Sequence, residues 1–181
     1  MTQLRPTFGP RLDQRAPVAQ SLGLSAEDLH EGLPAQLVSC GVPFAYVPLA
    51  SRAAVDRATL DRASWQRACA AHGLPEHKVF VFAIDERGDP TRLYSRMFAP
   101  LLGVAEDPGT GSASGPLGAY LVAHGVSTSA PVHRFASHQG VKMQRPCLID
   151  IRIEGTGSDI TRVQIGGAAC VAGTASLDLE A

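Results

Sequence analysis

The chain has 181 residues, of which 45% are hydrophobic and 18% are charged, and its formal net charge at pH 7 is -1. This composition is typical of a globular chain with its own apolar core, and it lacks both the basic surplus of a nucleic-acid-binding surface and any long run of like charge. No apolar run approaches a membrane span, and the first residues lack the apolar core of a signal peptide. We therefore expect a cytoplasmic protein that binds neither nucleic acid nor membrane.

Hydrophobic periodicity and turn residues predict an α+β fold in a single domain over residues 1–181. Apolar residues recur at helical spacing from 51 to 72, and Gly73 provides the stop. Runs rich in β-branched and aromatic residues predict strands. In chain order we expect an extended segment at 5–11, a short helix at 17–22, two strands around 40–43, a helix at 51–72, strands at 78–84 and 92–98, a helix at 112–124, and strands at 148–153, 160–165 and 168–179.

The helix at 112–124 has the composition of a buried element. Its residues are apolar or small on nearly every side of the helical wheel, and it is far too short to cross a membrane. Pro116 is compatible with an early helical position, where no intrahelical amide bond is lost. We therefore expect a mostly antiparallel sheet wrapped around one buried central helix, whose exposed end is its N-terminus.

That N-terminus is the place where chemistry is expected. The first backbone amides of a helix have no intrahelical partner and carry partial positive charge, and Gly109 and Gly111 allow a ligand to approach the backbone. Such an end can hold a carboxylate or phosphate without a lysine. The glycine spacing is not GxGxxG and no Lys-Ser/Thr pair follows, so a nucleotide cofactor is not expected.

The cysteines and histidines do not indicate a metal site. Cys40, Cys69, Cys147 and Cys170 form no CxxC pair, and the histidines show no HExxH spacing, so we expect reduced thiols, no bound metal and no cofactor. A small buried cysteine is the favoured interpretation of Cys40 over a nucleophile, and the other three are expected in the core.

Several motifs resemble those of the PhzF-like family of phenazine-biosynthesis isomerases. The matching segments follow the family's order over almost the whole chain: RMFAP at 96–100, EDPGTGSA at 106–113, LGAYL at 117–121, QGVKMQRP at 139–146, and the supporting VSCGVPF at 38–44 and VQIGG at 163–167. Within them Gly109 stands where alanine is usual, Gln144 replaces a common glycine, Cys147 a common serine and Cys40 a common threonine.

The resemblance implies one half of a diaminopimelate-epimerase-like fold. In that fold two similar lobes each wrap a sheet around a central helix, and the active site lies between the two helix N-termini. The sequence resembles the C-terminal lobe only, and the family's N-terminal lobe, with the glutamate that serves as general acid and base, has no counterpart here. We therefore expect either a homodimer or a partner lobe.

The same resemblance assigns site residues and a reaction. Asp107 falls on the family's active-site aspartate, and Thr110, Gly111 and Ser112 fall on the segment that binds a small carboxylate-bearing substrate. The implied activity is a cofactor-independent isomerase or epimerase that takes a proton from one carbon and returns it elsewhere. The alternative from a different class is a non-catalytic remnant or a stand-alone binding module that keeps the lobe fold.

Two residues have alternative interpretations that the sequence leaves open. Asp107 is either a site residue or only the N-cap of the buried helix. Arg96 either meets an acidic substrate or pairs with Glu106 or Asp107. His124, near the end of the same helix, is expected to complement the helix dipole.

Overall fold

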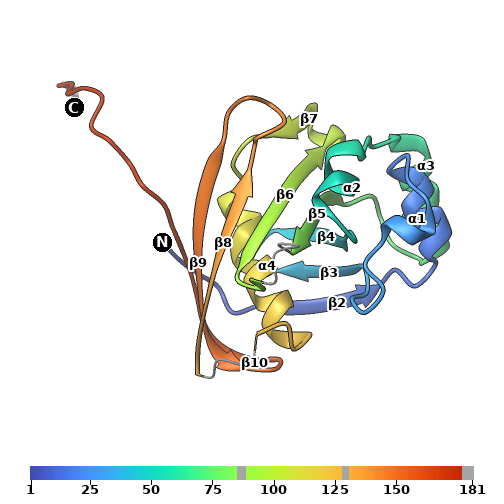
Figure 1. The fold of residues 1–181 in the computed structure, drawn as a ribbon, viewed down its shortest axis with the longest axis horizontal. Helices are drawn as coiled ribbons and strands as arrows, with labels where there is room; N and C mark the ends of the chain where they lie inside the picture. The colour runs from blue at the N-terminus through green and yellow to red at the C-terminus, as the bar shows by residue number, and fades with distance from the viewer. Residues whose placement is uncertain (85–88, 128–130, 177–181) are drawn as a thin grey trace, which may run out of the picture.

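The computed structural model describes residues 1–84, 89–127 and 131–176, and its order of elements is shown in Figure 1. Most of the regular structure is strand, interrupted by four short or medium helices. In chain order the elements are β1 (Thr2–Gln3), β2 (Thr7–Arg11), α1 (Arg15–Ser21), the 3-10 turn η1 (Ala26–Asp28), β3 (Gln36–Ser39), β4 (Pro43–Pro48), α2 (Arg52–Arg57), α3 (Arg62–Ala71), β5 (Lys78–Ile84), β6 (Arg92–Ala99), the 3-10 turn η2 (Pro100–Leu102), β7 (Val104–Asp107), α4 (Gly111–Ala123), β8 (Val132–Gln139), β9 (Cys147–Thr156) and β10 (Asp159–Gly166).

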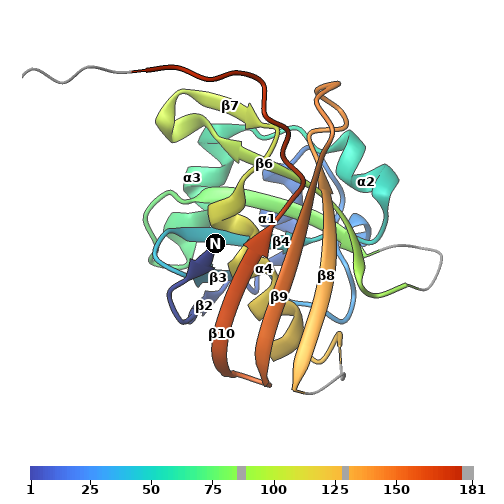
Figure 2. The same cartoon turned by 90° about the vertical axis from the view of Figure 1, so that its left-hand side faces the viewer.

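The strands form one mixed sheet that curls around α4. Its order is β1-β10-β9-β8-β6-β5-β4-β3-β2, and β7 pairs with β6 beside this path. Most neighbours are antiparallel, as expected, but β4 with β5 and β6 with β8 are parallel, so the sheet is mixed. In Figure 2, β8, β9 and β10 stand in front of α4, and the strands from β2 to β4 lie beyond it.

Two apolar clusters lie on opposite faces of this sheet. On the inner face, every residue of α4 from Ala113 to Val122 is buried, and α4 packs on β9 and β10 through side chains such as Ile151, Ile153 and Val163. On the other face α1, α2 and α3 cover β4, β5 and β6, as Figure 1 shows, and Trp65 is buried there. The sheet is therefore covered on both sides along its middle, while β9 and β10 turn their apolar side chains, such as Ile151, Ile153 and Val163, towards α4.

The region expected as one helix at 51–72 is divided. Ser51 caps α2 by accepting a hydrogen bond from the amide of Ala54, and Asp61 caps α3 by accepting one from Ser64. Between them residues 58–61 leave the helical conformation, because each cap requires extended backbone at the start of its helix. Two caps in one periodic stretch are the signal of two helices rather than one.

The strand predictions fail at four places. The strands β1, β7 and β8 were not predicted. The segment 168–179 was expected to be a strand, but its described part, 168–176, has no regular structure and is exposed, and 177–179 lie outside the described residues. A strand needs a neighbour to accept its backbone hydrogen bonds, and this tail leaves the body after β10 with none, as seen in Figures 1 and 2.

Candidate functional site

The turn between β7 and α4 carries the predicted site residues. It packs against the turn that follows β8, and this approach requires a glycine at Gly140, which has φ of +73°. A Cβ at Gly140 would lie 2.5 Å from the carbonyl oxygen of Pro108 and 2.3 Å from that of Arg145. The site turn is therefore built from two segments about thirty residues apart in the sequence.

A closed hydrogen-bond set joins Asp107, Thr110 and Gln139. The Thr110 hydroxyl donates to Oδ2 of Asp107 at 2.5 Å, and the Thr110 amide donates to Oε1 of Gln139 at 3.1 Å. The Gln139 Nε2 donates to the Asp107 carbonyl at 2.7 Å and to the Thr110 hydroxyl at 2.9 Å. Gln139 is fully buried at the end of β8, so this one amide fixes both residues relative to the sheet. Its role in the site was not predicted, although it begins the quoted 139–146 segment.

The start of α4 leaves backbone amides available. Thr110 is the N-cap residue, and its carbonyl accepts from the amides of Ala113 and Ser114. Within the described residues, nothing accepts a hydrogen bond from the amides of Gly111 and Ser112, and Ser112 is exposed. Unpartnered amides at a helix N-terminus attract an anion. This end of α4 can therefore bind an anionic group such as a carboxylate or a phosphate.

Asp107 does not occupy the N-cap position of α4. The cap position belongs to Thr110, three residues later, and the Asp107 carboxylate accepts from the Thr110 hydroxyl rather than from a helix amide. Among the described residues Oδ1 of Asp107 has no hydrogen-bond partner, and the residue is half-buried. The Asp107 side chain is thus fixed through Oδ2, and Oδ1 is available to a ligand.

Arg96 is occupied within the fold. Its guanidinium forms a bidentate pair with Glu106, with both N···O distances at 2.8 Å, and Nη1 donates to the carbonyls of Val55 and Ala58 at the end of α2. Arg96 is only 6% exposed. Of the two interpretations left open above, the pair with Glu106 is the one that the structure contains, and Arg96 ties β7 to β6 and α2 beside the site.

Other sequence expectations need correction. His124 does not act as a cation at the helix end, because burial lowers its pKa and its ring packs on Tyr120 with centroids 4.4 Å apart. Cys170 is exposed and not in the core, whereas Cys69 is buried. Burial raises the pKa of Cys40 to about 12, so it is a protonated thiol at neutral pH and a poor nucleophile.

The described residues contain neither a metal-binding cluster nor a helix that could span a membrane. No group of three or more His, Cys, Asp or Glu side chains gathers there in a way that could hold a metal ion. None of the helices in the described ranges has the length and apolarity needed to cross a bilayer.

Comparison with known sequences decides the family. The profile of the PhzC-PhzF family, described as phenazine biosynthesis-like protein, matches residues 1–175. The chain belongs to this family. An uncharacterized isomerase of Bacillus subtilis, YfhB, is 31% identical to it over 180 residues, and a trans-2,3-dihydro-3-hydroxyanthranilate isomerase of Pseudomonas fluorescens is 43% identical over 81 residues.

Two solved structures contain the same fold over part of their length. A Bacillus anthracis protein superposes with a TM-score of 0.80 at 22% identity over 92% of this chain, and a predicted epimerase from Pseudomonas aeruginosa with 0.65 at 30% identity over 94%. The chain spans 59% of the length of YfhB and 56% of that of the Bacillus anthracis protein. Nearly the whole length of this PhzF-family chain thus matches little more than half of the length of each of these relatives.

Proposed function

We propose that this PhzF-family chain is the substrate-binding, C-terminal lobe of a cofactor-independent isomerase or epimerase that moves a proton on a small carboxylate-bearing molecule. The proposal rests on one observation: unpartnered helix amides and a fixed carboxylate lie in the same turn. The free amides of Gly111 and Ser112 lie at the start of α4, and the Asp107 carboxylate is fixed beside that start by Thr110 and Gln139.

The chemistry of each group determines its proposed role in the reaction. The amides of Gly111 and Ser112 bind the substrate carboxylate or the anion that forms when a carbon loses its proton. Asp107, with Oδ2 occupied by Thr110, orients the substrate or moves the proton through Oδ1. The general acid and base that the family resemblance implies is a glutamate of the other lobe. The relative from Pseudomonas fluorescens provides the first substrate to test, trans-2,3-dihydro-3-hydroxyanthranilate.

The test is Asp107→Asn in protein purified from its native source, with deuterium uptake from D₂O into that substrate as the assay. We expect turnover to fall about 10²- to 10⁴-fold, the usual contribution of a proton-transferring group. Stability should change little, because the side-chain oxygen of asparagine still accepts from the Thr110 hydroxyl. Asp159→Asn, an exposed carboxylate in β10, is the matched control. Unchanged turnover in Asp107→Asn would remove this residue from the mechanism.

The assignment to one lobe also predicts a partner. We propose that the exposed tail at 167–176 completes a sheet outside this chain, either in the other lobe or in a second copy. The tail supports this because it is apolar and unpaired: Val171 is 89% exposed and Cys170 is exposed. An edge or tail of this kind is a ready template for strand addition.

Two measurements test the lobe and the partner. The intact mass of the native protein should exceed that of the 181-residue chain if an N-terminal lobe is joined to it. The 181-residue chain alone should sediment as a dimer or larger species, and shortening it after Gly166 should restore the monomer. A monomer at high concentration with the tail intact would contradict the proposed pairing.

A further inference from the structure

A separate cavity lies far from the start of α4. It has a volume of about 280 Å³ and is formed by the loop that joins β2 to α1 and by the loop that leads from η1 into β3. Tyr120, in the last turns of α4, donates to the carbonyl of Pro34 in the cavity wall. Since a helix rises about 1.5 Å per residue, the ten residues from Thr110 to Tyr120 separate this wall from the site turn by about 15 Å.

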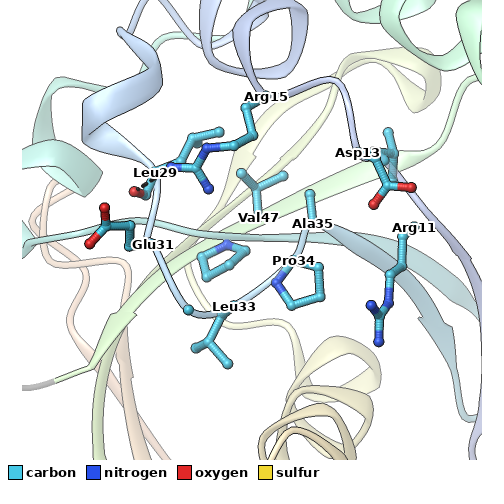
Figure 3. A pocket seen from close by; sticks show the side chains of 12 residues that line it. Arg11, Asp13, Arg15, Leu29, Glu31, Leu33, Pro34, Ala35 and Val47 are labelled. Carbon is cyan, nitrogen blue, oxygen red and sulfur yellow. Dashed lines mark hydrogen bonds between the residues drawn. The ribbon is translucent and has the colours of Figure 1, made fainter.

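The lining of the cavity combines an apolar floor with unpaired charges. Val47, Ala35 and Leu29 are buried and supply the floor. Figure 3 shows Arg15 and Glu31 on one side of this floor. The same figure shows Arg11 and Asp13 on the other side. In the part of the chain that the structure describes, none of these four charged side chains forms an ion pair.

Of these four charged side chains, Arg15 is the one whose position is already fixed for binding a ligand. It is half-buried, and its guanidinium donates to the carbonyls of Ala26, Leu29 and His30, each at 3.0 Å. A guanidinium has five N–H donors, so three bonds leave two donors unused. Because the carbonyls already fix the side chain, little rotamer entropy remains to be lost when a ligand binds.

Neither a simple anion nor a simple cation matches this lining. An anion at Arg15 meets the carboxylate of Glu31 on the same side of the floor, and a cation at Glu31 meets the guanidinium. A zwitterion satisfies both charges. A cavity of about 150 Å³ holds benzene, so 280 Å³ has room for roughly ten non-hydrogen atoms, the size of one amino acid.

We propose that this cavity binds a free α-amino acid with an apolar side chain. The carboxylate pairs with Arg15, the ammonium group pairs with Glu31, and the side chain lies on Val47 and Ala35. The site is independent of the proposed isomerase reaction, because it shares no residue with the turn at Asp107 and Thr110.

The test is an NMR titration of the ¹⁵N-labelled chain with L-leucine, followed at the amides of Gly32 and Ala35. Two analogues isolate the charges: 4-methylpentanoic acid lacks the ammonium group, and 3-methylbutylamine lacks the carboxylate. We expect saturable shifts with L-leucine at millimolar concentration and at least about tenfold weaker binding of each analogue, since a charged hydrogen bond is lost in each. Glu31→Gln should weaken the binding of L-leucine about tenfold, and Asp159→Asn, which removes an exposed carboxylate outside the cavity, should not.

Three outcomes would overturn the proposal. The first is no shift at Gly32 or Ala35 with L-leucine up to about 10 mM, a concentration that detects even weak binding. The second is shifts confined to Gly111 and Ser112, which would place the amino acid at the α4 start instead. The third is equal binding of N-acetyl-leucine amide, which has neither charge and would assign the cavity to a segment of polypeptide.

Discussion

Two departures from the family pattern touch each other, and their coupling can be measured. By the family resemblance, alanine is expected where this chain has Gly109, and serine where it has Cys147. A Cβ built on Gly109 would lie 2.9 Å from the Cys147 sulfur and 3.4 Å from its Cβ. Ordinary carbon contacts lie at about 3.5 to 4.0 Å, so alanine at 109 forces the sulfur to move by at least about half an ångström. The glycine thus makes room for the larger side chain.

The magnitude follows from two opposing effects of Gly109→Ala. Overpacking costs about 1 to 3 kcal/mol in a tight core, and here the lower part of that range applies because Gly109 is exposed and a cysteine side chain can rotate. Gly→Ala at a compatible backbone gains about 0.4 to 1 kcal/mol by restricting the unfolded chain. Gly109 has no positive φ, so this gain is available. We expect a net loss of about 0.5 to 1 kcal/mol in the natural background and a net gain in the Cys147→Ser background.

The assay is urea unfolding of the two single variants, the double variant and the parent chain. We expect a coupling free energy of about 1 kcal/mol or more between positions 109 and 147, above the roughly 0.5 kcal/mol within which independent sites add. Gly109→Ala combined with Cys170→Ser, in the exposed tail, is the uncoupled control. Additive effects at 109 and 147 would refute the argument that the glycine accommodates the sulfur.

Three further predictions concern stability. Arg96→Met should cost about 3 to 5 kcal/mol of unfolding free energy in urea, because it leaves the carboxylate of Glu106 without its partner; a loss under 1 kcal/mol would contradict this. Gln139→Leu should cost about 1 to 3 kcal/mol, because the buried amide of Thr110 loses its acceptor, and thermal unfolding checks this. Burial lowers the pKa of His124 in the folded chain, so the unfolded chain binds the proton more tightly and stability falls as the pH drops through 6.5. His124→Gln should reduce that fall, and an unchanged pH profile of the melting temperature would contradict it.

The apolar strands β5 and β6 and the buried helix α4 were the parts that the sequence could predict. The strands at β5 and β6 and the helix at α4 have limits within one residue of those expected, because each has an apolar pattern of its own. The Asp107 segment was recognised as a helix start for the same reason: it is a local pattern of small and polar residues. Which residue caps the helix was not predictable locally, since Thr110 is held by Gln139 from another strand.

The strand β8 shows why some strands were not predicted from the sequence. Its inward positions alternate as a buried strand should, but three of the four are polar: His133, Ser137 and Gln139. Each is satisfied by a partner distant in the sequence. His133 contacts the carbonyl of Gly155, Ser137 shares a hydrogen bond with Ser95 of β6, and Gln139 binds the site turn. Burial of such residues is decided by tertiary hydrogen bonds, which hydrophobic periodicity does not register.

The helix that carries the proposed site is itself a product of tertiary packing. Three glycines and a proline make α4 a poor helix in isolation. Pro116 lies inside the helix, contrary to the expectation of an early position, so no amide reaches the Ser112 carbonyl in the usual way. The glycines allow the backbone of α4 to lie close to the side chains of β9 and β10. A Cβ at Gly118 would lie 2.5 Å from Ile151, and one at Gly115 would lie 2.7 Å from Val163. Because β9 and β10 hold α4 through these contacts, the position of its N-terminal amides depends on the curvature of the sheet.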